Sequence, residues 1–341
     1  MTPQIHIAGH AASLEYPIGD LVLRSEFGTD QVCGPASATF SMLRGTRRPP
    51  AWVVKDAPGQ VTLGGRPLLG GYVSEVDWTN DSSVHIVGHA TDGNSAVCLT
   101  AAGLTTSTPN VAIDTAITNG WVGWTRATSI SATPYAATDS TAEVTYVGEL
   151  LGSWSSAGAR PFVGPDGFVT TVADPQTPSL FLLPGTGELS WATENMADVL
   201  VAWYFNPYGA TAYDSVGTGR VVKKVDLTPL GPMTSTAARA KLNALLAQAT
   251  TGSWTGGITF GAGQIYGGLT LAAAWQILTA GAMVRLLGHP DPRPNRNTTV
   301  TDVISEATEW NVPAGEITLT PRGMVARDWA AILADAGAKE G

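Results

Sequence analysis

Short runs of alternating hydrophobic and polar residues dominate the first hundred residues, and they predict β-strands. The clearest runs cover residues 36–43, 60–63, 66–78 and 83–90. Gly64 and Gly65 separate the second run from the third, which is typical of a β-hairpin. Within 72–78 the alternation changes phase, as it does at a bulge or in a curved barrel strand. Closely spaced strands of this kind favour a small barrel or sandwich.

The pattern changes near residue 105. Residues 111–119 place their apolar side chains mostly on one helical face before Gly120. Ser140–Glu143 has the form of a capping box and predicts a second helix over 144–154. Residues 160–163 and 168–172 flank a Gly-Pro-Asp-Gly turn and predict a hairpin. We expect a compact α+β unit here.

Strand patterns return after residue 196. Residues 237–248 form the clear exception, because they are rich in strong helix formers and follow Thr234-Ser-Thr capping residues. A short helix is expected at 327–334. The remaining runs predict strands at 199–205, 219–226, 257–260, 275–278, 282–287, 300–305 and 316–320.

Two hairpins of the predicted set resemble each other. Residues 73–88 and 304–321 both run strand, tryptophan, polar turn, strand, and the second carries one extra residue. The similarity is either chance or the trace of a duplicated barrel. The sequence therefore predicts a mainly β fold with an α+β insertion. Two related small β-barrel domains, 1–104 and 196–326, would flank an α+β domain, 105–195, and 327–341 would be a short C-terminal helix and tail.

The composition of the chain indicates which kinds of partner it could bind. Only 14% of the 341 residues are charged and the net charge is −9. Stable nucleic-acid binding is disfavoured, since basic residues cluster only at Arg44, Arg47 and Arg48. Few charges beside 11 tryptophans suggest a surface covered by protein partners. We expect neither a signal peptide nor a membrane anchor, because no basic-then-apolar N-terminus and no apolar run of about 20 residues occurs.

The two cysteines leave two readings open. Cys33 and Cys98 lie in strand-like surroundings without CxxC spacing. They are either buried thiols or a disulfide across neighbouring strands.

Residues that could carry chemistry are few. His85 and His89 are four apart on an expected strand, without the glutamate and helical spacing of an HExxH zinc site. Glu75 and Asp77 would share a strand face, as polar surface residues or as a glycosidase-like pair. No GxSxG elbow occurs, and Gly252–Gly257 lacks the GK[ST] ending of a phosphate loop.

The tryptophans could line a sugar groove, but their scatter fits core and interface anchors better. This set comprises Trp121, Trp124, Trp191, Trp203, Trp254 and Trp275. We assign no catalytic, cofactor-binding or metal-ligating residue, and we expect a protein that is not an enzyme.

The order of three stretches resembles the minor tail proteins of long-tailed actinobacterial phages and, more distantly, the tail-hub and baseplate-hub family. The first is Cys33–Leu43 with Gly70–Trp78. The second comprises Thr108–Ile117, Val122–Arg126 and Glu149–Trp154, and it ends in Asp166–Val169 and Ala173–Pro175. The third comprises Ala274–Ile277, Gly281–Leu286, Glu306–Trp310, Ile317–Pro321 and Arg327–Trp329.

The resemblance spans residues 28 to 335 and implies a virion protein of the tail tip. It implies a homotrimer whose six barrels form a ring between the tail tube or distal tail protein and more distal receptor-binding proteins, with the tape-measure protein as a neighbour. DNA would pass the ring without stable binding, which the acidic balance fits. Many hub proteins carry long C-terminal extensions with cell-wall-degrading activities, and the resemblance, which ends near residue 335, does not imply these activities here. A carbohydrate- or receptor-binding tip module and a hydrolase are the alternatives.

Overall fold

The computed structural model describes most of the chain in two compact units. The described residues are 3–26, 32–43, 48–78, 82–95, 97–99, 109–126, 144–147, 159–173, 175–184, 189–192, 197–228, 231–249, 253–279, 281–293 and 298–322. The first unit comprises Met1–Gly187 and Gly257–Arg322, and the second is built around Glu188–Gly256. The two units are a different division of the chain from the predicted domains 1–104, 105–195 and 196–326. Those domain bounds stay a prediction. The helix expected at 327–334 lies outside the described residues.

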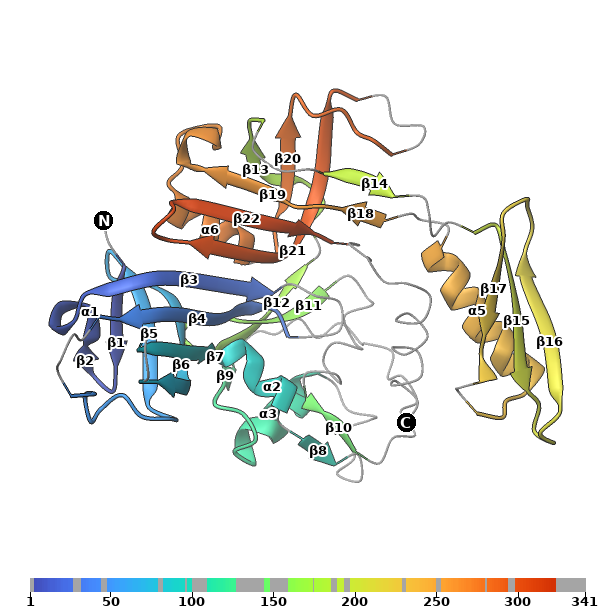
Figure 1. Ribbon diagram of the computed structural model, residues 1–341. Coiled ribbons are helices and arrows are strands. Elements are labelled where there is room, and N and C mark those ends of the chain that lie inside the picture. Colours follow the sequence, from blue (N-terminus) through green and yellow to red (C-terminus); the bar gives the residue numbers. More distant parts are fainter. Residues whose placement is uncertain are drawn as a thin grey trace. The chain divides into compact units, whose positions relative to one another are not determined.

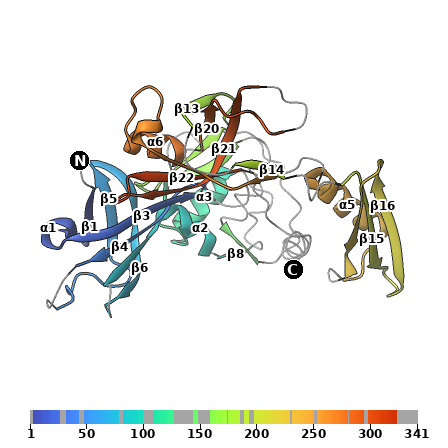
Figure 2. The ribbon, with the colours of Figure 1, turned by 45° about the horizontal axis from the view of Figure 1, so that its top comes forward.

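A 12-stranded sheet forms the body of the first unit and curls into a half-barrel (Figures 1 and 2). Its strands in the N-terminal region are β1 (Gln4–Ile7), β2 (His10–Ala11), β3 (Ile18–Glu26), β4 (Gly34–Met42), β5 (Pro58–Leu63), β6 (Arg66–Asp77) and β7 (Ser83–Gly88). The others are β13 (Pro178–Leu182), β19 (Ile258–Gly261), β20 (Met283–Leu287), β21 (Val300–Asn311) and β22 (Glu316–Pro321). The mainly β fold class is thereby confirmed.

The sheet has two halves that meet at the antiparallel pair β3–β4. Read in one direction across the sheet, the order β5-β6-β7-β4 is followed by β3-β21-β22-β19. The central hairpins of the halves, β6–β7 and β21–β22, are the two that the sequence pattern pairs. Each carries a register shift, at Val73/Glu75 and at Ser305/Ala307. The predicted change of phase within β6 is therefore confirmed as a bulge-like irregularity.

Glycines allow the backbones of β5, β6 and β7 to approach closely. Gly59, Gly71 and Gly88 are consecutive partners across these strands. A Cβ atom on Gly71 would lie 1.8 Å from the carbonyl oxygen of Val87, and one on Gly88 would lie 2.2 Å from that of Pro35. No other residue fits such distances, so the glycines permit the tight curl of this half.

A helix, α6 (Leu271–Thr279), packs on the sheet where the sequence pattern predicts a strand at 275–278. That prediction is wrong. The backbone N–H of Ala273 donates to the hydroxyl of Thr270 at 3.2 Å, which caps the helix. Trp275 is fully buried, and its ring centroid lies 6.0 Å from that of Trp310 on β21. Trp275 and Leu278, three residues apart, form one buried helical face.

The α+β insertion occupies the middle of the first unit's chain. It contains α3 (Pro109–Thr118), β8 (Val97–Leu99), β9 (Thr125–Arg126), β10 (Val144–Tyr146), β11 (Ala159–Val163) and β12 (Phe168–Ala173). Its core gathers Val32, Ala90, Ile113, Ala116, Val122, Trp124, Val147, Val163 and Val169. The helix at 111–119 and the hairpin β11–β12 are confirmed.

The helix expected at 144–154 is wrong at its start. Residues Val144–Tyr146 pair with Val97–Leu99 as strands, while 148–154 lie outside the described residues. Short elements complete the first unit: α1 (Ala12–Glu15), η1 (His89–Thr91), α2 (Asp92–Ser95) and η6 (Ala262–Gln264). Cys33 is buried, and the side chain of Cys98 is outside the described part, so both readings of the cysteines remain open.

The second unit is a small α/β layer. Strands β15 (Val199–Phe205), β16 (Thr211–Gly217) and β17 (Val222–Asp226) form a sheet in the order β16-β15-β17, and α5 (Ser235–Ala249) covers one face (Figure 2). Thr234 accepts from the N–H of Ala237 at 3.2 Å, confirming the predicted cap. The sequence pattern missed β16. A further pair joins β14 (Ser190–Ala192) to β18 (Ser253–Thr255). Among the described residues no helix is long and apolar enough to span a membrane.

Candidate functional site

The face of the curled sheet opposite its core is a continuous polar surface, which we call the polar sheet face. Along β3, β21 and β22 the buried residues alternate with the residues of this face. One row across the strands runs Thr259, Thr318, Glu309, Arg24 and Ser37. The next runs Glu316, Asn311, Val22, Thr39, His85 and Glu75. The face thus crosses both halves of the sheet.

Contacts between neighbouring strands fix the side chains of this face. The hydroxyls of Thr259 and Thr318 lie 3.0 Å apart. Arg24 donates to Glu309, with Nη2 2.7 Å from Oε2, although the two residues are 285 positions apart in sequence. The β3–β21 junction between the halves is therefore held by an exposed ion pair as well as by its backbone ladder.

The polar sheet face has a negative formal charge. Its carboxylates and those at its margin are Asp20, Glu26, Glu75, Asp77, Glu309 and Glu316. The described residues of these same strands include two arginines: Arg24, which is paired with Glu309, and Arg66, which begins β6. The negative potential therefore extends over several strands and disfavours approach of a polyanion.

His85 lies within this face. Its Nδ1 is 2.7 Å from the hydroxyl of Ser74. Burial lowers the pKa of His85 below 6.5, the positive charge of Arg24 lowers this pKa further, and Glu75 opposes both effects. His85 is accordingly neutral at pH 7.

The residues singled out from sequence do not form a catalytic or metal centre. Glu75 and Asp77 are both exposed on the polar sheet face, as expected, and Glu75 is the cross-strand partner of His85. His85 lies in β7 and His89 in η1. Over the described ranges no group of three or more metal-ligating side chains occurs.

His89 belongs to a buried polar cluster that joins β6 to the α+β insertion. The indole N–H of Trp124 donates to the carbonyl of His89 at 2.6 Å. Asp92 accepts from the N–H of Gly123 at 3.1 Å, and its Oδ2 lies 3.7 Å from Nδ1 of His89. Burial, with the nearby Asp92 charge, raises the pKa of Tyr72 to about 12, so its hydroxyl stays protonated. Because these contacts link separate elements, the cluster acts as a structural bridge.

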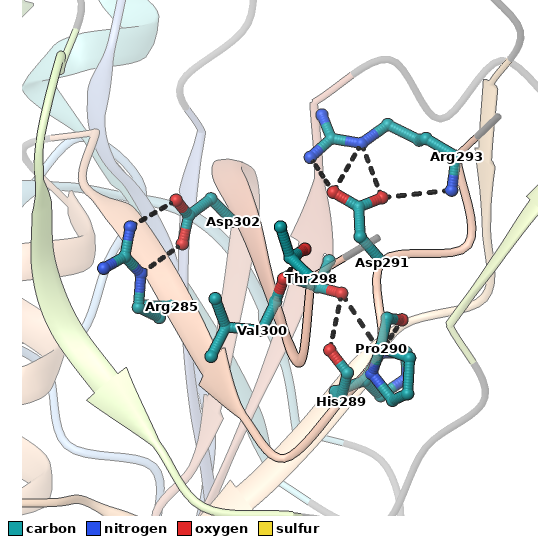
Figure 3. Close-up of polar contacts among 9 residues, drawn as sticks. Arg285, His289, Pro290, Asp291, Arg293, Thr298, Val300 and Asp302 are labelled. Atoms are coloured by element: carbon teal, nitrogen blue, oxygen red, sulfur yellow. Dashed lines mark hydrogen bonds and ion pairs between the residues drawn. The ribbon is translucent and has the colours of Figure 1, made fainter. Parts of the chain in front are cut away.

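A second polar cluster is formed by residues of β20 and β21 and by the described residues that follow β20 (Figure 3). Arg285 donates twice to Asp302, at 2.7 Å each. Arg293 pairs with Asp291, whose side chain is only 3% exposed, and the hydroxyl of Thr301 donates to the carbonyl of His289 at 2.9 Å. Each carboxylate is paired with its own arginine, which suits a structural role better than acid–base chemistry.

The tryptophans divide between core and surface. Trp124, Trp254 and Trp275 are buried, and Trp191 packs edge-on against Trp254 at 4.9 Å. These residues anchor cores, as expected. Trp203 is only half-buried, on the sheet face of the second unit that α5 leaves uncovered.

Comparison with solved structures shows that the fold is shared with phage tail proteins. The 43 kDa tail protein of prophage MuSo2 from Shewanella oneidensis has 11% identity and a TM-score of 0.54, over 93% of this chain and 96% of that one. The tail protein from Neisseria meningitidis MC58 has 13% identity and a TM-score of 0.55, over 94% and 97%. No family model matches the sequence, and no curated protein matches it.

Proposed function

We propose that the chain is a non-enzymatic structural protein of a phage tail, and that three copies form a hub ring at the tail tip. The ring would connect the tail tube or distal tail protein to distal tip and receptor-binding proteins, with the tape-measure protein as a neighbour. The same proposal includes the relationship to tail proteins of actinobacterial phages that the sequence resemblance indicates.

The polar sheet face carries this proposal. A ring through which DNA passes needs a lining that is hydrated and does not hold phosphates, and cations that neutralise phosphates are what create stable DNA binding. The rows through Thr318, Glu309 and Thr39 supply hydroxyls and carboxylates, while Arg24 is already engaged by Glu309. Such a surface suits passage of DNA on ejection.

The two similar halves of the sheet support the expected stoichiometry. The hairpins β6–β7 and β21–β22 occupy corresponding places on either side of β3–β4, with register shifts at Val73/Glu75 and Ser305/Ala307. Two similar halves in each of three copies provide six similar positions around a ring. A closed ring also removes unpaired sheet edges by pairing them between neighbours.

Light scattering and negative-stain microscopy of the purified full chain test the proposal. We expect a mass three times that of one chain and ring-shaped particles with a central channel, either alone or after addition of the distal tail protein. A monomer under both conditions would contradict the hub assignment. The Arg24→Ala and Glu309→Ala variants should retain the mass, because one exposed ion pair contributes little.

A further inference from the structure

On the face of the second unit's sheet opposite α5, the described side chains are exposed or half-buried. Helix α5 lies over one face of this sheet (Figure 2). Leu200, Ala202 and Tyr204 of β15 belong to the core beneath α5, so the alternate residues of β15 point the opposite way. The outward residues on β15 are Val201, Trp203 and Phe205, those on β16 are Thr211, Tyr213 and Ser215, and those on β17 are Val222, Lys224 and Asp226. We call this set the β15–β17 face. It mixes aromatic, hydroxyl and charged side chains.

Its central row is Tyr213, Trp203 and Asp226, which are direct partners across the three strands. Adjacent strands lie about 4.8 Å apart, so the Tyr213 and Trp203 side chains start from neighbouring positions on the same face. Tyr213 is 72% exposed. A tyrosine this exposed gains little from packing within the unit, so its apolar ring is available to a ligand.

Hydrogen bonds hold the acidic end of that row in place. Asp226 accepts from the N–H and the hydroxyl of Thr228, at 2.9 and 2.6 Å, and from the indole N–H of Trp203. These bonds, the Thr228 hydroxyl first, lower the pKa of Asp226, so it is ionised at neutral pH. Trp203 and the carboxylate are thereby fixed before any ligand arrives.

We propose that the β15–β17 face binds a neutral saccharide, with a pyranose ring stacked on Trp203 and Tyr213. One face of a pyranose presents C–H groups, which suit an aromatic surface, while its hydroxyls project around the ring. Asp226 accepts hydrogen bonds from these hydroxyls, and Lys224 donates to them. This site is independent of the ring proposed above.

The charge of the face selects a neutral ligand over the other occupants. Lys224 and Asp226 lie on the same face of β17 and cancel in formal charge. A nucleic acid would require several unpaired cations. A second protein chain would bury both charges next to Trp203, at an unfavourable desolvation cost, whereas interface cores are depleted of charged residues. Sugar hydroxyls can satisfy both groups.

Affinity electrophoresis and tryptophan fluorescence of the full chain test this site. The probes are soluble neutral hexasaccharides of glucose, mannose, galactose and N-acetylglucosamine. We expect at least one probe to bind. Tyr213→Ala and Trp203→Ala should each weaken that binding by about tenfold or more, and Lys224→Ala should weaken it less. Tyr266→Ala is the matched control, because Tyr266 is 62% exposed but lies in the first unit.

The outcomes separate this inference from the hub assignment. Oligomer mass and circular dichroism are measured on the same samples. Because Tyr213 is exposed, Tyr213→Ala is the variant least expected to disturb folding. Loss of saccharide binding with unchanged mass supports the site. Binding of none of the probes, or equal binding by the Tyr213 and Tyr266 variants, overturns it. A fall in mass on Tyr213→Ala also overturns it, because the face would then be a contact between protein chains.

Discussion

At the scale of single residues, the curl of the sheet depends on positions where a side chain cannot fit. Gly71 is one, because its missing Cβ leaves room for the carbonyl of Val87 on the next strand. The sequence shows glycines at 59, 71 and 88 but not that they are partners in register, since strand pairing determines that. Their spacing along the chain is irregular, so only the sheet reveals the line they form.

Gly71→Ala should destabilise the first unit by about 1–3 kcal/mol or more. The added methyl group would lie 1.8 Å from a backbone oxygen, and separating the two strands is the only relief. Urea unfolding followed by tryptophan fluorescence measures the change. Gly263→Ala is the control: nothing lies within 4 Å of its Cβ position, so a change within about 0.5 kcal/mol is expected there. Equal effects of the two substitutions would show that β6 and β7 approach less closely.

At the scale of elements, local patterns predicted hairpins well and failed where a neighbour decided the outcome. The hairpin β11–β12 was predicted, because its Gly-Pro-Asp-Gly turn is encoded locally and Gly167 adopts φ +78°. Val144–Tyr146 follows a capping-box pattern yet pairs with Val97–Leu99 as a strand. Trp275–Leu278 resembles a short apolar strand yet belongs to α6, whose signal was the alanine run after Thr270.

The connections of the second unit depend on carboxylates that should make it sensitive to acid. Asp198 accepts from the N–H groups of Arg220 and Val221, each at 2.9 Å, and these bonds lower its pKa below 3.8. The pKa of Asp214 is lowered first by the Ser235 hydroxyl and then by Arg239, which tie β16 to α5. Each group therefore favours the folded state while it is ionised.

The second unit should therefore lose stability as the pH falls below about 4. Above pH 3.8 Asp198 is ionised in both folded and unfolded chains, and its full contribution is present. As the pH falls, the unfolded chain takes up the proton first, and the contribution disappears as the pH passes the lower folded pKa. Hydrogen exchange of β15 amides between pH 5 and 2.5 measures this loss. Asp198→Asn keeps an acceptor oxygen but does not titrate, so it should flatten the profile; an unchanged profile would contradict this role.

At the scale of the whole molecule, the polar sheet face could not be predicted from the sequence alone. The acidic balance and the shared face of Glu75 and Asp77 were visible in the sequence, but Arg24 and Glu309 are 285 positions apart, and only the fold brings them together. Pairing across the β3–β21 junction depends on loop closures that no local pattern encodes. The face therefore emerges from topology, although each of its residues follows ordinary strand alternation.

Reversing the negative charge of the polar sheet face should make this face bind DNA. Glu75 and Glu316 occupy the same row on opposite halves, so Glu75→Lys with Glu316→Lys adds cations to both sides of β3–β4. The assembled ring of this double variant should retain duplex DNA in gel-shift assays, and the affinity should fall steeply between about 50 and 200 mM salt. The unaltered ring should show no retention under the same conditions.

The stoichiometry of that binding decides whether the face lines a channel. A duplex inside a ring excludes a second one, so saturation at about one duplex per ring is expected if the lysines surround a common axis. Glu15→Lys is the comparison, because Glu15 lies on α1 and off the polar sheet face. If the double variant bound one duplex per chain, or if Glu15→Lys caused equal retention, the face would lie on the exterior and the negative charge would serve solubility instead.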